Sequence, residues 1–352
     1  MTGAAPGLLA GDRAEDRVER RPVSGGRLRA GVVLGVVGLG VLSVLSLALG
    51  SNRLPLSEVI DALSGTQGVA YDIVVGQRLP RTVLALMVGA ALAVSGALMQ
   101  GLTRNPLADP GLLGVQAGAS FAVALIVAFF PGLWRPALTL MALVGAVVTT
   151  IAVYLVGSSR RRGSSPATLV LAGMAFTAVL AGFTSALALL RPTAFQALRF
   201  WNSGDLADKG WEATVILAPF LVVGLLLAAT AARGLNAMAM GEDLAASLGS
   251  NVRWTRISSV TGVTLLAGAA TAAVGPIWFL GLMVPHVARW IVGPDQRWVL
   301  AYSLIGGPVL LLASDIVGRL VVADEMPAGI TMSFVGAPVL ILLVRRRKAS
   351  GL

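Results

Sequence analysis

Cysteine is absent from this chain of 352 residues, and histidine occurs only once, as His286. A zinc site built from cysteine and histidine is therefore excluded, and so is a cysteine nucleophile. The single histidine lies in the stretch MVPHVAR, where we expect a structural role. The pattern G-x-x-x-x-G-K-[ST] is missing as well, so the chain does not hydrolyse ATP in the P-loop manner, and no cofactor is expected.

Charge is also scarce. Charged residues make up 12% of the chain, against about 25% in soluble domains, while 56% of the residues are hydrophobic. Most charge-free runs reach the length of about 20 residues with which a helix crosses a bilayer. The sequence therefore predicts an all-α, polytopic transmembrane bundle of about ten helices within residues 30–348. The predicted spans are 30–50, 82–102, 111–131, 136–157, 166–190, 213–232, 257–274, 277–292, 298–318 and 329–344.

One charge-free stretch is too long for a single crossing. Arg256 and Arg289 enclose 32 uncharged residues, roughly 48 Å of helix at about 1.5 Å per residue. Gly275-Pro276 divides this stretch, because proline removes a backbone donor and its ring clashes with the preceding turn. Two spans are therefore predicted here.

The first apolar run is predicted to be an uncleaved helix. A signal peptide would have an apolar core of about 7–15 residues after a short basic start. This run has 21 residues and follows a tail of 29 residues with mixed charge. The tail, 1–29, lacks apolar periodicity, so we expect it to be disordered and cytoplasmic.

Lysine and arginine are unevenly divided between the predicted loops. With the N-terminus in the cytoplasm, 19 of the 27 lie in inner segments and 8 in outer ones. Because cytoplasmic loops carry the excess of these residues, both termini are predicted to be cytoplasmic. The net charge of +10 thus reflects membrane orientation, and no nucleic-acid partner is expected.

Acidic residues are nearly missing from the predicted spans. Proton- or sodium-driven carriers usually keep ionisable groups at mid-membrane, so an ion-coupled secondary carrier is disfavoured, although it stays open. Asp315 lies near the outer end of a span, and an i,i+4 ion pair with Arg319 is its simplest role. An aspartate cluster that would hold magnesium for diphosphate chemistry is absent too.

The longest inner connection, 233–256, contains the stretch GEDLAASLG at 241–249. It is rich in good helix formers, acidic residues at its start favour the helix dipole, and a glycine stands at each end. We predict a short amphipathic helix that docks a motor protein through apolar anchors, with an inert surface turn as the alternative. The residues predicted to make this contact are Gly241, Glu242, Asp243, Ala245, Ala246, Leu248 and Gly249.

Motifs between about Pro55 and Arg347 follow one another in a recognisable order. They are RLPRTVLALMVGAALAVSGALMQGLTRNPLADPGLLGVQAGAS at 78–120, LAGMAF at 171–176, RFWNSGDL at 199–206, LNAMAMGEDLAASLGSNV at 235–252, GPIWFLGLMVPHVARWIVG at 275–293, DIVGR at 315–319 and GAPVLILLVRRR at 336–347. The chain resembles the type II ABC importer permeases, the family that takes up iron–siderophore complexes, haem and cobalamin. Within it, the likeness is greatest to the ferric-enterobactin permeases.

The resemblance implies a ten-helix transport subunit and not an enzyme. Two permease subunits, identical or paralogous, would form a pathway within the membrane lipid. Two cytoplasmic ATPase subunits would bind beneath them, on the coupling loop 233–256, and an extracytoplasmic siderophore-binding protein would deliver the substrate. A catecholate ferric siderophore is the substrate that this likeness favours, with haem or a cobalamin as alternatives.

The resemblance also assigns roles to individual residues. Arg78, Arg81 and Arg319 match positions that face carboxylates of the binding protein, and internal pairing, such as that of Arg319 with Asp315 or Glu325, is the alternative. Four residues of the inner loops match the family's cytoplasmic gate, with ordinary capping and turn roles as the alternative. These are Asn105, Leu107, Ser164 and Ser165.

Overall fold

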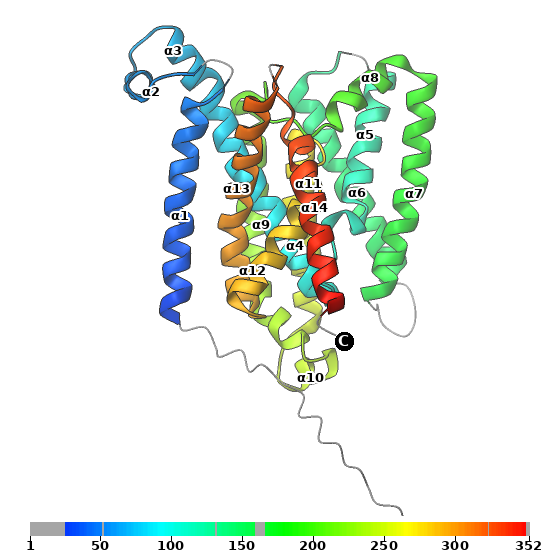
Figure 1. Ribbon diagram of the computed structural model, residues 1–352. Coiled ribbons are helices and arrows are strands. Elements are labelled where there is room, and N and C mark those ends of the chain that lie inside the picture. Colours follow the sequence, from blue (N-terminus) through cyan, green and yellow to red (C-terminus); the bar gives the residue numbers. More distant parts are fainter. Residues whose placement is uncertain (1–24, 51–52, 131, 159–165, 323, 350–352) are drawn as a thin grey trace, which may run out of the picture.

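Helices are the only regular elements in the residues that the structure, a computed structural model, describes, namely 25–50, 53–130, 132–158, 166–322 and 324–349. Seven of these helices are long and apolar enough to cross a bilayer, and three shorter apolar helices accompany them (Figure 1). The long helices are α1 (Gly25–Ala48), α4 (Leu79–Thr103), α6 (Arg135–Ser158), α7 (Pro166–Leu190), α9 (Gly210–Met238), α11 (Val252–Val274) and α13 (Gln296–Val321). The shorter ones are α5 (Val115–Phe129), α12 (Leu280–Val292) and the apolar part, Ala328–Leu342, of α14 (Ala328–Ala349).

Each of the ten predicted spans corresponds to one of these ten helices. The long uncharged stretch is divided as predicted, because α11 ends at Val274 and α12 begins only at Leu280. The boundary of the predicted tail needs a correction. Residues 1–24 lie outside the described part of the chain, but residues 25–29 form the first turn of α1. α1 begins and α14 ends at the same end of the bundle (Figure 1).

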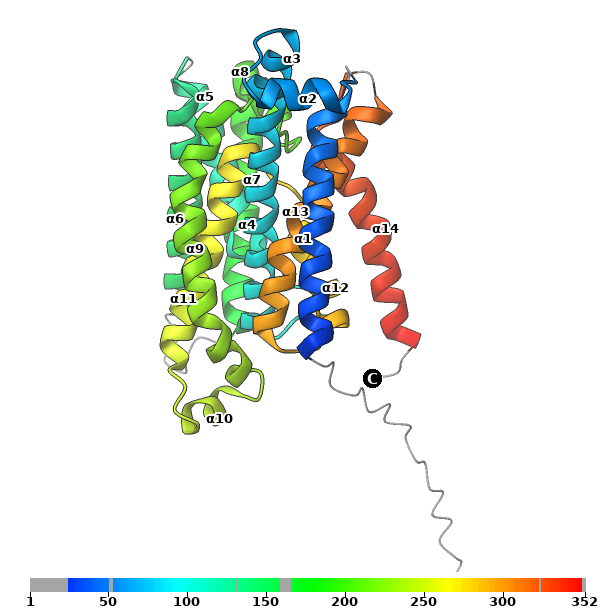
Figure 2. The same ribbon diagram turned by 90° about the vertical axis from the view of Figure 1, so that its left-hand side faces the viewer.

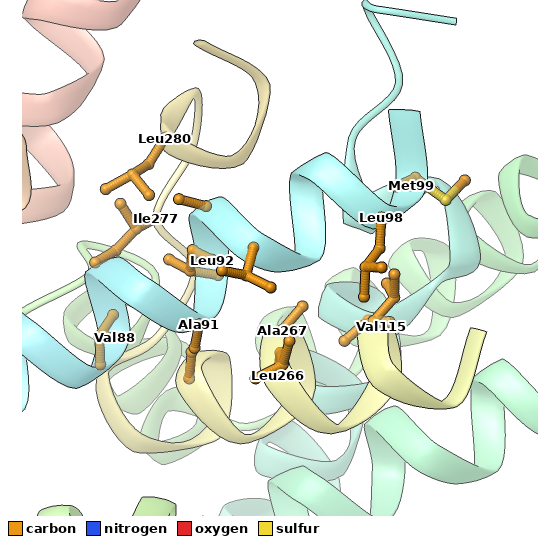
Figure 3. Packing of buried hydrophobic residues seen from close by; sticks show 14 of the residues in the cluster. Val88, Ala91, Leu92, Leu98, Met99, Val115, Leu266, Ala267, Ile277 and Leu280 are labelled. Atoms are coloured by element: carbon orange, nitrogen blue, oxygen red, sulfur yellow. The ribbon is translucent and has the colours of Figure 1, made fainter. Parts of the chain in front are cut away.

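The bundle is built around α4 and α11. In the most apolar window of each of these two helices 83% of the residues are buried, whereas the corresponding share for α1 and α7 is 11%. Buried leucine, valine and alanine side chains of α4 interlock with those of α11 and with Val115 of α5 (Figure 3). α4 and α11 therefore form the core, whereas most of the apolar surface of α1 and α7 is not buried within this chain.

Small residues allow α4 to pack closely against its neighbouring helices. A Cβ atom placed on Gly96 of α4 would lie 1.7 Å from the carbonyl oxygen of Gly281 in α12. Any side chain there would clash with backbone, which is harder to displace than the end of a flexible side chain. The run GAALAVSGA at 89–97 thus serves close helix packing, as expected for small residues in membrane helices.

Short elements cover both ends of the bundle. The outer end carries α2 (Leu56–Leu63), α3 (Val69–Tyr71), the π-helix η1 (Asp72–Arg78) and α8 (Pro192–Trp201) (Figure 1, Figure 2). The inner end carries α10 (Glu242–Ser247), and the 3-10 turn η2 (Pro110–Leu113) precedes α5. Helix-forming residues between two glycines predict α10, but the sequence analysis predicts none of the outer elements, because they are too short or too polar to stand out as spans.

Candidate functional site

The predicted amphipathic helix is present as α10, which projects from one end of the bundle (Figure 1). Gly241 and Gly249 flank it with φ angles of 115° and 78°, a backbone region that favours glycine. Ala245 is fully buried and packs into the chain's own core, so it does not take part in the exposed apolar surface expected of it. Ala246 is exposed, and Leu248 is 64% exposed.

A second leucine, which the sequence interpretation left out, completes that surface. Leu244 is 47% exposed and precedes Leu248 by one helical turn, so the two side chains lie on one face of α10. Two exposed leucines one turn apart form an apolar contact that a groove of another protein can accept.

Glu242 fixes α10 to the bundle. Its carboxylate accepts hydrogen bonds of 2.9 and 3.0 Å from Nη2 of Arg256, close to the start of α11. It also lies 3.5 Å from Nη2 of Arg104, the residue that ends α4 in a left-handed conformation. This acidic residue therefore connects α10 to two core helices at once, a role that its position at a helix N-terminus did not reveal.

The candidate gate residues are only partly described. Asn105 follows Arg104 directly, and its Oδ1 accepts a hydrogen bond of 3.0 Å from the N–H of Leu107, which is the turn role left as the alternative. Leu107 is 40% exposed. Ser164 and Ser165 lie outside the described residues, so their gate role stays a prediction.

At the outer end, a buried carboxylate lies between two arginines. Asp315 is fully buried, and its Oδ1 is 2.8 Å from Nη2 of Arg81, while its Oδ2 pairs with Arg319. Nη1 of Arg81 also lies 2.6 Å from Oε2 of Glu325. The i,i+4 pair predicted for Asp315 is confirmed, and Arg81 joins it from a different helix.

Two of these outer arginines cap the end of α1. Nη1 of Arg78 donates to the carbonyl oxygens of Leu47 and Ala48, at 2.8 and 3.0 Å. Nη1 of Arg319 donates to the carbonyl oxygen of Ser46 at 2.9 Å. The last carbonyls of a helix have no partner within it and carry the negative end of its dipole, so guanidinium groups stabilise them.

These contacts change the interpretation of the three arginines. Arg78 and Arg319 are buried, and the side chain of Arg81 is only 11% exposed. They do come together, around an outer cavity of about 590 Å³ that Asp205, Lys209 and Asp324 also line. In this conformation, however, they make the internal contacts that the sequence left as the alternative to partner docking.

A second cavity of about 780 Å³ lies beside α5 and α7. Its wall is mostly apolar, with Met174 and Ala178 of α7 and the segment from Pro276 to Leu282. Neutral hydroxyl and amide groups interrupt that wall at Ser120, Thr177, Thr184, Ser185 and Asn202. A surface of this kind can hold a bulky ligand without a strong charge–charge attraction.

One acidic residue also reaches this cavity. Asp109, in the connection between α4 and η2, lines it and caps η2 by accepting a hydrogen bond of 2.8 Å from the N–H of Gly111. Burial raises the pKa of the Asp109 carboxyl, and the Gly111 N–H opposes that rise. Gln116, 9% exposed, lines the same cavity, and its Oε1 has no hydrogen-bond partner in the described part of the chain. The pair offers acceptors to a ligand's hydroxyl or amide groups.

His286 lies away from both cavities. It is buried in α12 and its ring packs edge-on against that of Trp290, with the centroids 5.1 Å apart. The structural role expected of the single histidine is consistent with this packing.

The described residues form a multi-pass bundle of ten membrane-type helices with α4 and α11 at its core. The protein is a membrane permease, a transport component without catalytic activity of its own. Residues 38–346 match the family model described as FecCD transport family, and the chain belongs to this family of ABC importer permeases. Its partners are accordingly an ATPase and a binding protein.

Individual relatives agree with this classification. The ferric enterobactin transport system permease protein FepD of Escherichia coli (strain K12) is 47% identical over 313 residues, which are 88% of this chain and 93% of that protein. The iron(3+)-hydroxamate import system permease protein FhuB of Bacillus subtilis (strain 168) is 39% identical, with 92% and 85% covered. A solved structure, described as a metal-chelate type ABC transporter in an inward-facing conformation, superposes with a TM-score of 0.78 at 29% identity, with 92% and 99% covered.

Proposed function

We propose that this permease imports a ferric siderophore, of the catecholate type, into the cytoplasm. The observation that carries the proposal is the 47% identity to FepD, a permease named for ferric enterobactin, over 88% of the chain. The second cavity supports it, because a mostly apolar wall with neutral polar groups lets a bulky ligand pass without trapping it in a deep energy well.

The test is uptake of radioactive iron under iron limitation in a strain that lacks this chain. Loss of uptake from a ferric catecholate, restored by the gene, would support the proposal. Intact catecholate uptake beside a lost ferric hydroxamate, haem or cobalamin would move the assignment to that substrate. Uptake that persists after removal of every candidate ATPase partner would contradict ATP-driven import altogether.

We further infer that α10 is the surface to which the ATPase docks. Leu244 and Leu248 form its exposed apolar face, with Ala246 beside them, while Glu242 and Ala245 hold the helix against the bundle. Gly241 and Gly249 permit the sharp entry and exit of the chain. Asp243 is exposed and is available for a polar contact at the edge of the interface.

A pair of charge insertions tests this docking surface. Leu248→Asp places a carboxylate on the apolar face and should reduce co-purification of the ATPase at least tenfold, since a lost anchor can cost about 2 kcal/mol or more. Ser247→Asp adds the same charge on the neighbouring polar face, next to Asp243, and should have little effect. Equal ATPase binding by both variants would contradict docking through the leucines.

We infer that the complete importer has two permease subunits, identical or paralogous, two ATPases and an extracytoplasmic siderophore-binding protein. We infer that the binding protein docks at the outer cavity, which the three arginines line. In that state Arg78, Arg81 and Arg319 would have to exchange internal partners for carboxylates of the binding protein. At the inner end, Asn105, Leu107, Ser164 and Ser165 would form the gate.

A further inference from the structure

A third cavity, of about 410 Å³, lies between α9 and α13 and shares no lining residue with the two described above. Val94 of α4 lines it together with residues of the two flanking helices, which also contact each other. Its volume lies within the range of about 300–1,000 Å³ that small-molecule sites usually occupy. The flanking residues are Leu225, Ala228, Ala229 and Ala232 of α9 and Leu300, Ala301 and Leu304 of α13.

Two arginines mark one end of this groove. Arg233 lies five residues before the end of α9, and Arg297 is the second residue of α13, so both stand at the inner end of the bundle. From Leu225 to Arg233 the wall on α9 extends for roughly 12 Å, at about 1.5 Å per residue. The groove therefore has an apolar part within the membrane and a cationic end at the inner surface.

Neither arginine has an ion-pair partner among the residues that the structure describes. The nearby Asp295 is already engaged, since its Oδ1 accepts from Nδ2 of Asn236 at 2.7 Å and from the backbone N–H of Arg297 at 3.0 Å. Both arginines are exposed. By contrast, Arg104 and Arg256 of the same end share the carboxylate of Glu242.

The groove faces the side of the molecule that carries exposed apolar side chains. Leu226 and Val222 of α9 are 63% and 56% exposed, and Leu304 of α13, which lines the groove, is 40% exposed. α1 packs against α13, and only 11% of the residues in its most apolar window are buried. Exposed apolar side chains on membrane-spanning helices are suited to contact with lipid chains.

We propose that this groove binds one anionic phospholipid of the inner leaflet. The phosphate lies between Arg233 and Arg297, and part of an acyl chain packs along the alanines of α9 and α13. Guanidinium groups bind phosphate oxygens in two-point geometry, and basic pockets between membrane helices at the cytoplasmic side suit anionic headgroups. The small side chains leave room for the chain, and the two unpaired charges account for a preference over zwitterionic lipid.

Native mass spectrometry of the full-length chain tests the proposal, with phosphatidylglycerol and phosphatidylcholine of identical acyl chains as probes. The wild type should retain one phosphatidylglycerol about twenty-fivefold more strongly, roughly fivefold for each arginine. The double variant Arg233→Gln and Arg297→Gln should lose this preference. Arg253→Gln, which removes an exposed inner arginine outside the groove, should keep it.

A second variant tests the apolar part of the groove separately from the two arginines. Ala301→Phe fills the apolar part and retains both arginine side chains, so it should weaken retention of both lipids while the elution volume of the protein stays unchanged. Equal retention of the two lipids by the wild type would overturn the proposal, because the arginines would then only extend to the membrane surface. An equal loss in Arg253→Gln would overturn it as well.

Discussion

Asp315 is the residue on which the outer end of the bundle depends. It is fully buried and pairs with Arg81 and Arg319, which in turn contact Glu325 and the end of α1. A buried ion pair as such adds little net stability, but removal of one partner leaves the other charge buried without compensation. The importance of Asp315 thus lies in what its loss would leave behind.

We expect Asp315→Asn to destabilise the protein by about 3–5 kcal/mol, since two guanidinium groups would lose their carboxylate. Thermal unfolding in detergent, followed by the fluorescence of the native tryptophans, measures the effect. Asp61→Asn is the matched control, because Asp61 is exposed on α2. A shift no larger than that of the control would contradict a structural role for the network.

Gly96 leads to a second prediction at this scale. Gly96→Ala places a methyl group against the carbonyl of Gly281 and should destabilise the packing of α4 on α12 by about 1–3 kcal/mol. Gly38→Ala in α1, where no atom lies within 4 Å of the added Cβ, should be neutral or slightly stabilising. Denaturation curves of the two variants provide the comparison, and equal midpoints would show that α4 and α12 can separate at no cost.

At the scale of elements, α10 is held to the bundle by the carboxylate of Glu242 and by the buried side chain of Ala245. Glu242→Gln removes the attraction to Arg104 and Arg256, although each partly exposed pair contributes only about 0.2–1 kcal/mol. Global stability should therefore change little, while α10 becomes free to move relative to α4 and α11. We expect substrate-stimulated ATPase activity of the assembled importer to fall by about threefold to tenfold, in proportion to those energies.

Asp243→Asn controls for the loss of negative charge on α10. Asp243 is exposed and neighbours Glu242, but it makes no ion pair among the described residues. If both variants lower the ATPase stimulation equally, the effect comes from the lost negative charge at the interface. The ion pairs of Glu242 would then not couple α10 to the bundle.

The elements differ in how far the sequence predicts them. The ten spans follow from uncharged runs, and the break before α12 follows from Gly275-Pro276, because both signals are local. The pair of Asp315 and Arg319 is local too, since the two residues lie one helical turn apart. Arg81 joins the same pair from 234 residues away, which no pattern in one sequence can indicate. Asp109 lies in the connection between α4 and η2, and no local pattern indicates that this connection folds back to line a cavity.

For the whole molecule, the absence of cysteine makes the orientation directly testable. Thr66 lies just after α2, at the end of the bundle that carries α2 and α8, and Ser247 lies on α10 at the other end. Both residues are exposed, so each can be replaced by cysteine for labelling. A membrane-impermeant maleimide applied to intact cells should label only Thr66→Cys, and Ser247→Cys should react only in inverted vesicles. Labelling of Ser247→Cys from outside would reverse the topology derived from lysine and arginine.

The two ends of α4 each contribute to a charged contact, one at each end of the bundle. Arg81 places the first turn of this helix in the outer ion network, and Arg104, at its other end, meets the carboxylate of α10. α4 itself has 25 residues, roughly 38 Å of helix at about 1.5 Å per residue, and most of them are buried. A single helix thus spans the bilayer and takes part in an ion pair at each end. A tilt imposed on α10 from the cytoplasm can therefore reach the outer ion network through α4, so one helix connects the two faces of the membrane.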